Sequence, residues 1–238
     1  SGACNIGLGS DTLGALQTGN NNVAIGCAAL GAGTLTNCNI AIGQGAMGAV
    51  ADHAHVNIAI GRYAMCGAAA TEGQLNVAVG QCALLNVTTG CRNIAIGCGA
   101  LDSATVPNLN IGIGDQALGG ISTSSGATNN IGIGCYAGAG ITSGGYNSAI
   151  GTNGIASGTA GLTGNYNIAI GHTASETLQA ANDNVAIGRD AGDSVTNSNC
   201  TNNIGYNADR NTDLHGCMGA TMYAASFNDT SDCRFKCN

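Results

Sequence analysis

The sequence contains few of the side chains that build an ordinary globular core. Of its 238 residues, two are Phe, six are Tyr, one is Pro and none is Trp. Charged residues make up 8%, against about 25% in an average globular protein. Because aromatic side chains supply much of the buried area of conventional cores, their scarcity argues against an ordinary globular domain. Small side chains must instead bring backbone close to backbone.

Other protein classes are excluded by further absences. The hydrophobic content of 44% is the reverse of the composition of disordered chains. Gly follows no three-residue period, which excludes collagen. No apolar run approaches the roughly 18 residues of a membrane span, and no basic segment followed by an apolar stretch indicates a signal peptide. With 6 Lys and Arg against 13 Asp and Glu, nucleic-acid binding is not expected.

A five-residue segment, Asn-Ile-Ala-Ile-Gly or a close variant, recurs twelve times at intervals of 17 to 20 residues. A repeat of this length is typical of solenoids, in which each repeat forms one coil. The opening residues of the copies, the last of them degenerate, are Asn5, Asn22, Asn39, Asn57, Asn76, Asn93, Asn110, Asn130, Asn147, Asn167, Asn184 and Asn203. The closing residues are Gly9, Gly26, Gly43, Gly61, Gly80, Gly97, Gly114, Gly134, Gly151, Gly171, Gly188 and Gly205.

Within the segment, aliphatic residues alternate with Ala or Gly, which is the two-residue period of a β-strand. The second position is Ile or Val in eleven copies, with Ser148 as the exception. A second apolar position follows seven residues after the Gly in most copies, and turn-forming stretches come after it. Each repeat is therefore expected to hold two short strands and two turns. The many Gly residues make a helix-dominated fold costly.

The predicted fold is all-β: a parallel β-solenoid of about twelve 17–20-residue coils, occupying residues 1–206. Stacking at about 4.8 Å would give a rod roughly 55–60 Å long. The Gly column indicates positive φ or a close approach of backbones. The Asn column could form a ladder of side-chain amides between coils, or it could serve only to favour a tight turn.

The coil encloses a thin core, and ordering Gly is entropically expensive. Either the Ile and Val side chains or the Ala and Gly side chains can line the interior. The remaining face is too apolar to stay exposed over twelve coils, because large apolar patches normally mark interfaces. An obligate homo-oligomer is therefore expected.

The segments Asn-Val-Ala-Ile-Gly-Cys-Ala-Ala-Leu at 22–30 and Asn-Ile-Ala-Ile-Gly-Arg-Tyr-Ala-Met at 57–65 resemble the head repeats of trimeric autotransporter adhesins. They are even more similar to shaft repeats of bacteriophage tail fibres. The resemblance covers about residues 5–206. It implies parallel β-rolls, left-handed in the adhesins, three of which pack around a threefold axis as a homotrimer. Both families use such repeats as a spacer and a display surface.

After Asn207 the repeat is lost, and residues 207–238 are expected to form a cap or a junction to another module. The end of the chain, Ser231-Asp232-Cys233-Arg234-Phe235-Lys236-Cys237-Asn238, resembles the entry motif of the endosialidase-type intramolecular chaperone, which trimerises phage fibres and then cuts itself off. The resemblance implies a self-cleavage pair of Ser231 and Lys236, in which a Lys amine deprotonates the Ser nucleophile. A simple cap is the alternative.

The function expected from this resemblance is a structural and receptor-binding fibre protein of the virion, with no cofactor and no substrate-directed catalysis. Its partners would be further copies of itself, other tail-fibre or baseplate proteins, and a host surface receptor such as a glycan or an outer-membrane component. A trimeric adhesin head on a bacterial surface is the alternative, and an ice-binding solenoid is disfavoured because Thr is irregular. A glycan-cleaving enzyme would need paired carboxylates, which are sparse.

The twelve Cys residues are scattered over different columns. Free thiols that act as small apolar residues are favoured, with some disulfides as the alternative. Zinc binding by His215, Cys217, Cys233 and Cys237 is disfavoured by their unusual spacing. His53 and His55 could bind a metal at a trimer axis, but a solvated turn is favoured. No metal site is expected.

Overall fold

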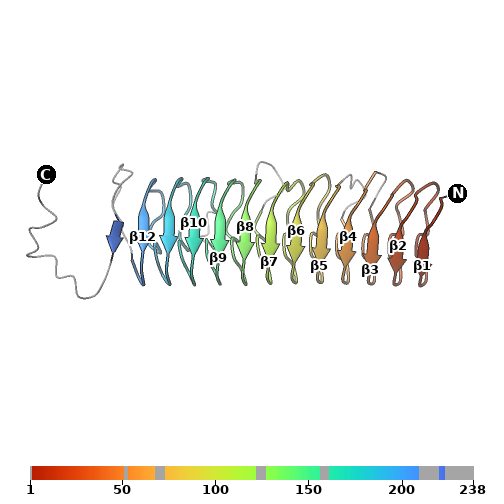
Figure 1. Ribbon diagram of the computed structural model, residues 1–238, viewed down its shortest axis with the longest axis horizontal. Helices are drawn as coiled ribbons and strands as arrows, with labels where there is room; N and C mark the ends of the chain where they lie inside the picture. Colours follow the sequence, from red (N-terminus) through yellow and green to blue (C-terminus); the bar gives the residue numbers. More distant parts are fainter. Residues whose placement is uncertain are drawn as a thin grey trace, which may run out of the picture.

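The computed structural model describes residues 2–50, 53–67, 73–121, 127–155 and 161–208, together with the backbone of a strand at Ala220–Met222. Within these residues the chain is all-β, and no helix is present. Figure 1 shows a long rod in which the strands lie side by side in one row, one strand for each coil. The strands are β1 (Ile6–Leu8), β2 (Val23–Ile25), β3 (Ile40–Ile42), β4 (Ile58–Ile60), β5 (Val77–Val79), β6 (Ile94–Ile96), β7 (Ile111–Ile113), β8 (Ile131–Ile133), β9 (Ser148–Ile150), β10 (Ile168–Ile170), β11 (Val185–Ile187), β12 (Asn202–Ile204) and β13 (Ala220–Met222).

The strands form a single parallel sheet in which spatial order follows chain order from β1 to β13. Equivalent positions of successive repeats pair with each other, as Ile94 does with Ile111. The predicted parallel β-solenoid is thereby confirmed. Strand β13 pairs with β12, so the sheet continues into the segment after residue 206.

Each coil holds one strand, so the prediction of two strands for each repeat is wrong. The second apolar segment consists of turns, with isolated bridges only among the described residues. Left-handed backbone at non-Gly positions replaces the second strand, as at Leu84 (φ 51°) and Arg92 (φ 58°). Their amides still bond between coils, since Leu84 N donates to Ala100 O at 2.9 Å and Arg92 N to Gln74 O at 3.0 Å. These inter-coil bonds offset the cost of the left-handed conformation.

The interior of the rod is built from small side chains. From β2 to β11 the central residue of each strand is Ala or Gly and is buried, as Ala95 is with an exposed fraction of 0%. The rest of the core consists of a second Ala, a Leu or Met and a further aliphatic residue from each repeat. Ala100, Leu101 and Ile121 are buried examples of these three positions. The Ala and Gly face of the strand therefore lines the core, and the Ile and Val face points outward. A thin coil has room only for the smaller set.

The Gly column has both properties that the sequence indicated. The φ values of these residues lie between 122° and 141°, a region that is essentially restricted to Gly. Backbones also approach closely, because a Cβ added at Gly97 would lie 2.2 Å from the carbonyl oxygen of Gly114. No side chain fits between these coils.

The Asn column forms the predicted side-chain ladder, here called the inner ladder. Oδ1 of Asn110 accepts the backbone N–H of Asn130 at 2.9 Å and its Nδ2–H at 3.2 Å. Nδ2 of Asn110 also donates to the carbonyl of Ala127 at 2.9 Å. From Asn22 to Asn184 these amides are at most 2% exposed. The ladder thus fixes both the stacking of coils and the closure of each coil.

The twelfth copy differs from the prediction that Asn203 belongs to the Asn column. Strand pairing places Asn203 opposite Ala186, in the central inward position. Thr201 occupies the ladder position instead and donates through N and Oγ1 to Oδ1 of Asn184, at 2.8 and 2.7 Å. Oδ1 of Asn203 is buried and has no partner among the described residues. The inner ladder and the alanine column therefore both change at β12.

Candidate functional surface

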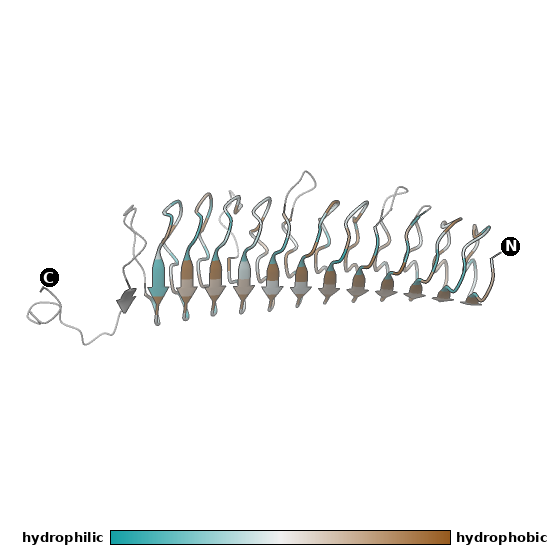
Figure 2. Cartoon of the chain, turned by 45° about the horizontal axis from the view of Figure 1, so that its top comes forward, coloured by the Kyte–Doolittle hydropathy of each residue, from teal (hydrophilic) through white to brown (hydrophobic). Residues whose placement is uncertain are grey.

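Three columns of outward-pointing side chains form what we call the outer face of the rod. The columns are the first and third residues of each strand and the residue that precedes each Asn. In Figure 2 the strands of most coils are brown, which marks apolar residues, and β12 is teal. The first-residue column is Ile6, Val23, Ile40, Ile58, Val77, Ile94, Ile111, Ile131, Ser148, Ile168, Val185 and Asn202; the third-residue column is Leu8, Ile25, Ile42, Ile60, Val79, Ile96, Ile113, Ile133, Ile150, Ile170, Ile187 and Ile204.

The apolar side chains of the outer face remain in contact with solvent. Eight of the Ile residues in the third-residue column are 36–42% exposed, from Ile60 to Ile204. Two columns about 7 Å apart and about 55 Å long make a strip on the order of 400 Å². That area is comparable to the largest apolar patch of a typical monomer, which is often functional.

The column that precedes each Asn widens this strip in the middle of the rod. Val56, Leu75 and Leu109 are 46–50% exposed in it. Further along, Tyr146 and Tyr166 stack with ring centroids 5.0 Å apart and an interplanar angle of 17°. Both rings are more than half exposed. This column therefore adds apolar side chains beside β4, β5, β7, β9 and β10, with Arg92 and Asn129 between them.

Charge is almost excluded from the outer face. Of its three columns, only Arg92 and Asp183 carry a formal charge, although the chain has a net charge of −7. The acidic residues of the described coils lie mainly in the turns, as Asp102 and Asp115 do. Two such faces can therefore approach without strong repulsion between like charges.

A second amide ladder, which no regular sequence pattern reveals, lies two residues before the Asn of the inner ladder in several coils. Backbone N of Asn20 donates to Oδ1 of Asn37 at 2.9 Å, and N of Asn165 donates to Oδ1 of Asn182 at 2.8 Å. His55 takes the same position, and its Nδ1 accepts the backbone N–H of Asn37 at 3.1 Å. The occupancy of this column is irregular, with Thr128, Gly145, Gln74 and Cys91 among the Asn and His residues, and this hides the ladder in the sequence.

The two histidines considered for a metal site are not on one strand face. His53 lies in a turn and is exposed, whereas His55 belongs to the second ladder. Their rings meet edge to face with centroids 6.3 Å apart. Among the described residues, no three His, Cys, Asp or Glu side chains gather closely enough to hold a metal ion. The structure thus assigns His55 a structural role.

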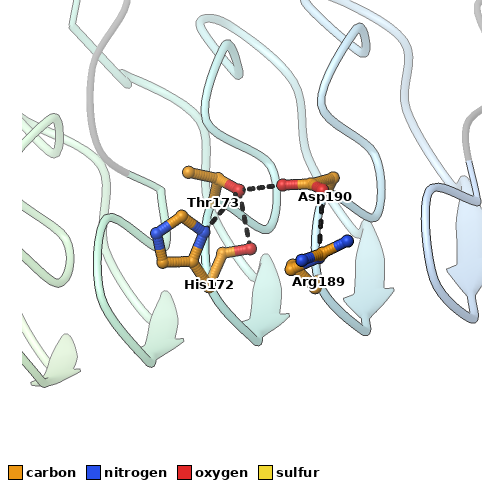
Figure 3. Close-up of polar contacts among 4 residues, drawn as sticks. All are labelled: His172, Thr173, Arg189 and Asp190. Atoms are coloured by element: carbon orange, nitrogen blue, oxygen red, sulfur yellow. Dashed lines mark hydrogen bonds and ion pairs between the residues drawn. The ribbon is translucent and has the colours of Figure 1, made fainter.

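A polar cluster lies on the turns after β10 and β11 (Figure 3). Oγ1 of Thr173 donates to Oδ1 of Asp190 and lies 3.1 Å from Nδ1 of His172. Nε of Arg189 is 3.4 Å from Oδ2 of Asp190. His172 and Arg189 are exposed and Thr173 and Asp190 are half-buried, so the cluster lies at the surface and is not an enclosed site of the kind that excludes water from a reaction.

The cluster extends to the next coil through an aromatic contact. The guanidinium carbon of Arg189 lies 4.3 Å from the ring centroid of Tyr206, which is 61% exposed. A similar pair, Arg62 and Tyr63, lies 5.6 Å apart on β4's coil. Exposed pairs of this kind contribute only about 0.5–1 kcal/mol. They order the surface of the rod locally.

No disulfide joins any two of the nine described Cys residues, as favoured from the sequence. None of them is buried: Cys4, Cys27, Cys38 and Cys98 are exposed, and the others are half-buried. Their expected use as small apolar filling is therefore not seen in these coils, where Ala fills the core.

Several predicted residues lie outside the described part of the chain. They are the proposed cleavage pair Ser231 and Lys236 and the disfavoured zinc ligands His215, Cys217, Cys233 and Cys237. Within the described ranges, no helix has the length and apolar character needed to cross a bilayer.

Comparison with known proteins gives no family assignment. No protein-family model matches the chain, and neither a curated protein nor a solved structure matches it.

Proposed function

We propose that this chain is a structural and receptor-binding fibre protein, three copies of which form a β-solenoid segment of a bacteriophage tail fibre. The segment spans distance and contacts the host surface. Its partners are further copies of the chain, other tail-fibre or baseplate proteins, and a glycan or outer-membrane component of the host. It belongs to the virion and needs no cofactor.

The observation that supports this proposal best is the apolar outer face on an elongated rod. The face runs along the described coils, stays solvent-exposed in a single chain and is nearly uncharged. The side chains of this surface repeat at a spacing of about 4.8 Å. A partner that contacts it along its whole length needs side chains at the same spacing, and another copy of the same rod has them. Packing three rods around one axis covers all three faces at once.

Light scattering of the purified protein tests the assembly. The expected mass is about 70 kDa, three times the 23.2 kDa of one chain, and electron microscopy should show unbranched rods. A stable folded species of one chain mass would refute the proposal.

The resemblance at the end of the chain adds a maturation step to this proposal. A longer precursor would be cut before Ser231. The Lys236 amine removes the proton from the Ser hydroxyl, the Ser oxygen attacks the Thr230 carbonyl and displaces the Ser231 amide nitrogen, and water hydrolyses the resulting ester to leave the Thr230 carboxylate. Mass spectrometry of the mature protein should then find a carboxy terminus at Thr230. Ser231→Ala and Lys236→Ala precursors should stay uncut and still trimerise. A wild-type precursor that remains uncut would contradict this step and leave the trimer proposal standing.

A further inference from the structure

One polar residue interrupts the central column of the outer face. Ser148 is the first residue of β9 and pairs with Ile131 on one side and Ile168 on the other. From Ile6 to Val185 every other strand has Ile or Val at this position. Ser148 is half-buried, and its hydroxyl makes no hydrogen bond to another described residue. Contacts within a single chain therefore do not explain why Ser148 takes the place of Ile or Val in this column.

The uniformity of the remaining column creates a problem for any assembly through the outer face. If one copy slides along its neighbour by one coil, about 4.8 Å, Ile and Val side chains again meet Ile and Val. Within the first-residue column, only the contacts of the terminal coil are lost. Register is weakly specified wherever a repeating apolar surface has no irregular feature. Some coil that differs from the others must supply it.

We infer that Ser148 sets the register of the trimer by forming a polar layer at its axis. This inference rests on the proposed function, since it assumes three parallel copies packed through the outer face. The first-residue column lies between the two other columns of that face, so a threefold arrangement brings it nearest the axis. In register, the three Ser148 hydroxyls lie at one level, and each donates to the next around the ring.

A shifted neighbour loses these bonds. A slip of one coil in either direction places the hydroxyl against Ile131 or Ile168 of the neighbour, where it has no hydrogen-bond partner. Burial of an unpaired hydroxyl is unfavourable. A single polar residue in the apolar seam of a coiled coil fixes register by the same effect. Asn202, the other polar residue of the column, lies at its end. Ser148 is therefore the polar residue that interrupts the column away from its ends.

Disulfide formation between introduced cysteines measures the register. Ile94 and Ile111 occupy the same column one coil apart. Chains carrying Ile94→Cys and chains carrying Ile111→Cys are co-expressed, assembled and oxidised, and linked peptides are identified by mass spectrometry. With Ser148 present, links 94–94 and 111–111 should form and the 94–111 link should be a trace. With Ser148→Val, the 94–111 link should rise to a yield comparable with the in-register links, at unchanged oligomer mass.

Two variants control for side-chain shape. Ser148→Thr keeps the hydroxyl and should keep the register, whereas Ile131→Val changes the same column without adding or removing polarity and should also keep it. Ser148→Ala replaces Ser148→Val if the latter does not fold. A Ser148→Val or Ser148→Ala assembly that stays in register overturns the inference, as does a wild-type chain that already mixes registers. A mass of one chain refutes the trimer itself and the inference with it.

Discussion

Two kinds of left-handed residue support the coil, and they tolerate different side chains. At Leu84 and Arg92, φ is between 50° and 60°, where a non-Gly residue costs about 1–2 kcal/mol. At Gly97, φ is 135° and the next coil's carbonyl occupies the space of a Cβ. The first kind is stabilised by its inter-coil hydrogen bond, whereas the second admits no side chain.

Gly97→Val should therefore prevent the central coils from stacking. The backbone strain contributes about 1–3 kcal/mol and the overlap with Gly114 at least as much again, about 1–3 kcal/mol or more. The expected result is loss of the cooperative thermal transition measured by circular dichroism. A variant that melts at the wild-type temperature would show that the column tolerates side chains.

Gly154 offers the opposite prediction. It lies three residues after its column Gly, where ten of the twelve copies have Ala, and its φ is not in the left-handed region. An added Cβ would meet its nearest atoms at 3.7 Å, an ordinary contact distance. Gly154→Ala should stabilise the protein by about 0.4–1 kcal/mol, because the unfolded chain loses conformational freedom. A lower midpoint in a urea titration would contradict this expectation.

At the scale of the element, the inner ladder is the most demanding structure. Each amide in the middle of the ladder uses both its oxygen and its nitrogen, and all of its partners are buried. Loss of one side chain leaves several buried groups without a partner, each at a cost of about 1–3 kcal/mol. The ladder is thus more sensitive to substitution than an exposed amide.

Asn110→Ala should lower the free energy of unfolding by several kcal/mol, since Asn130 and the Ala127 carbonyl lose partners. The matched control is Asn86→Ala, which removes one exposed bond from Nδ2 to the carbonyl of Asp102 and should cost about 1 kcal/mol or less. Equal losses for the two variants, measured by denaturant titration, would show that the ladder adds nothing to an ordinary amide bond.

The sequence predicts those elements whose chemistry leaves one choice of residue. The strand pattern, the Gly column and the Asn column are visible because Ile or Val, Gly and Asn recur in them in nearly every copy. The second strand expected around Val87 is absent because Leu84 and Arg92, on either side of it, take a left-handed backbone that is set by bonds to other coils. Asn203 differs from its expected position for a related reason. Because Asn202 and Asn203 are adjacent, the sequence alone leaves the register ambiguous, and pairing with β11 places Asn203 in the central inward position.

At the scale of the whole molecule, polarity is separated around the rod. Ile and Val cover one side, most charged side chains occupy the turns, and the amides of the inner ladder lie in the interior. A face of this kind in an acidic chain favours association through the apolar side alone. Charge placed on that side should therefore affect assembly more than folding.

Ile96→Lys combined with Ile113→Lys should dissociate the proposed trimer, because the ammonium groups of three copies would be brought together and desolvated. Both positions are about one-third exposed in a single chain, so the coil itself has room for them. Ser103→Lys, in an exposed turn, is the matched control and should leave the mass at about 70 kDa. If the double variant keeps the trimer mass in light scattering, the outer face is not the interface.

The two amide ladders run in opposite senses along the rod. In the inner ladder the preceding coil supplies the Asn oxygen, as Asn110 does for Asn130, whereas in the second ladder it supplies the backbone N–H, as Asn165 does for Asn182. A finished coil therefore presents both an acceptor and a donor to the coil that the ribosome releases next. Each closure spans only about one repeat of chain, so propagation is local. The last coil formed therefore acts as a template for the next one. Synthesis from the amino terminus supplies the coils in the order in which they can be added.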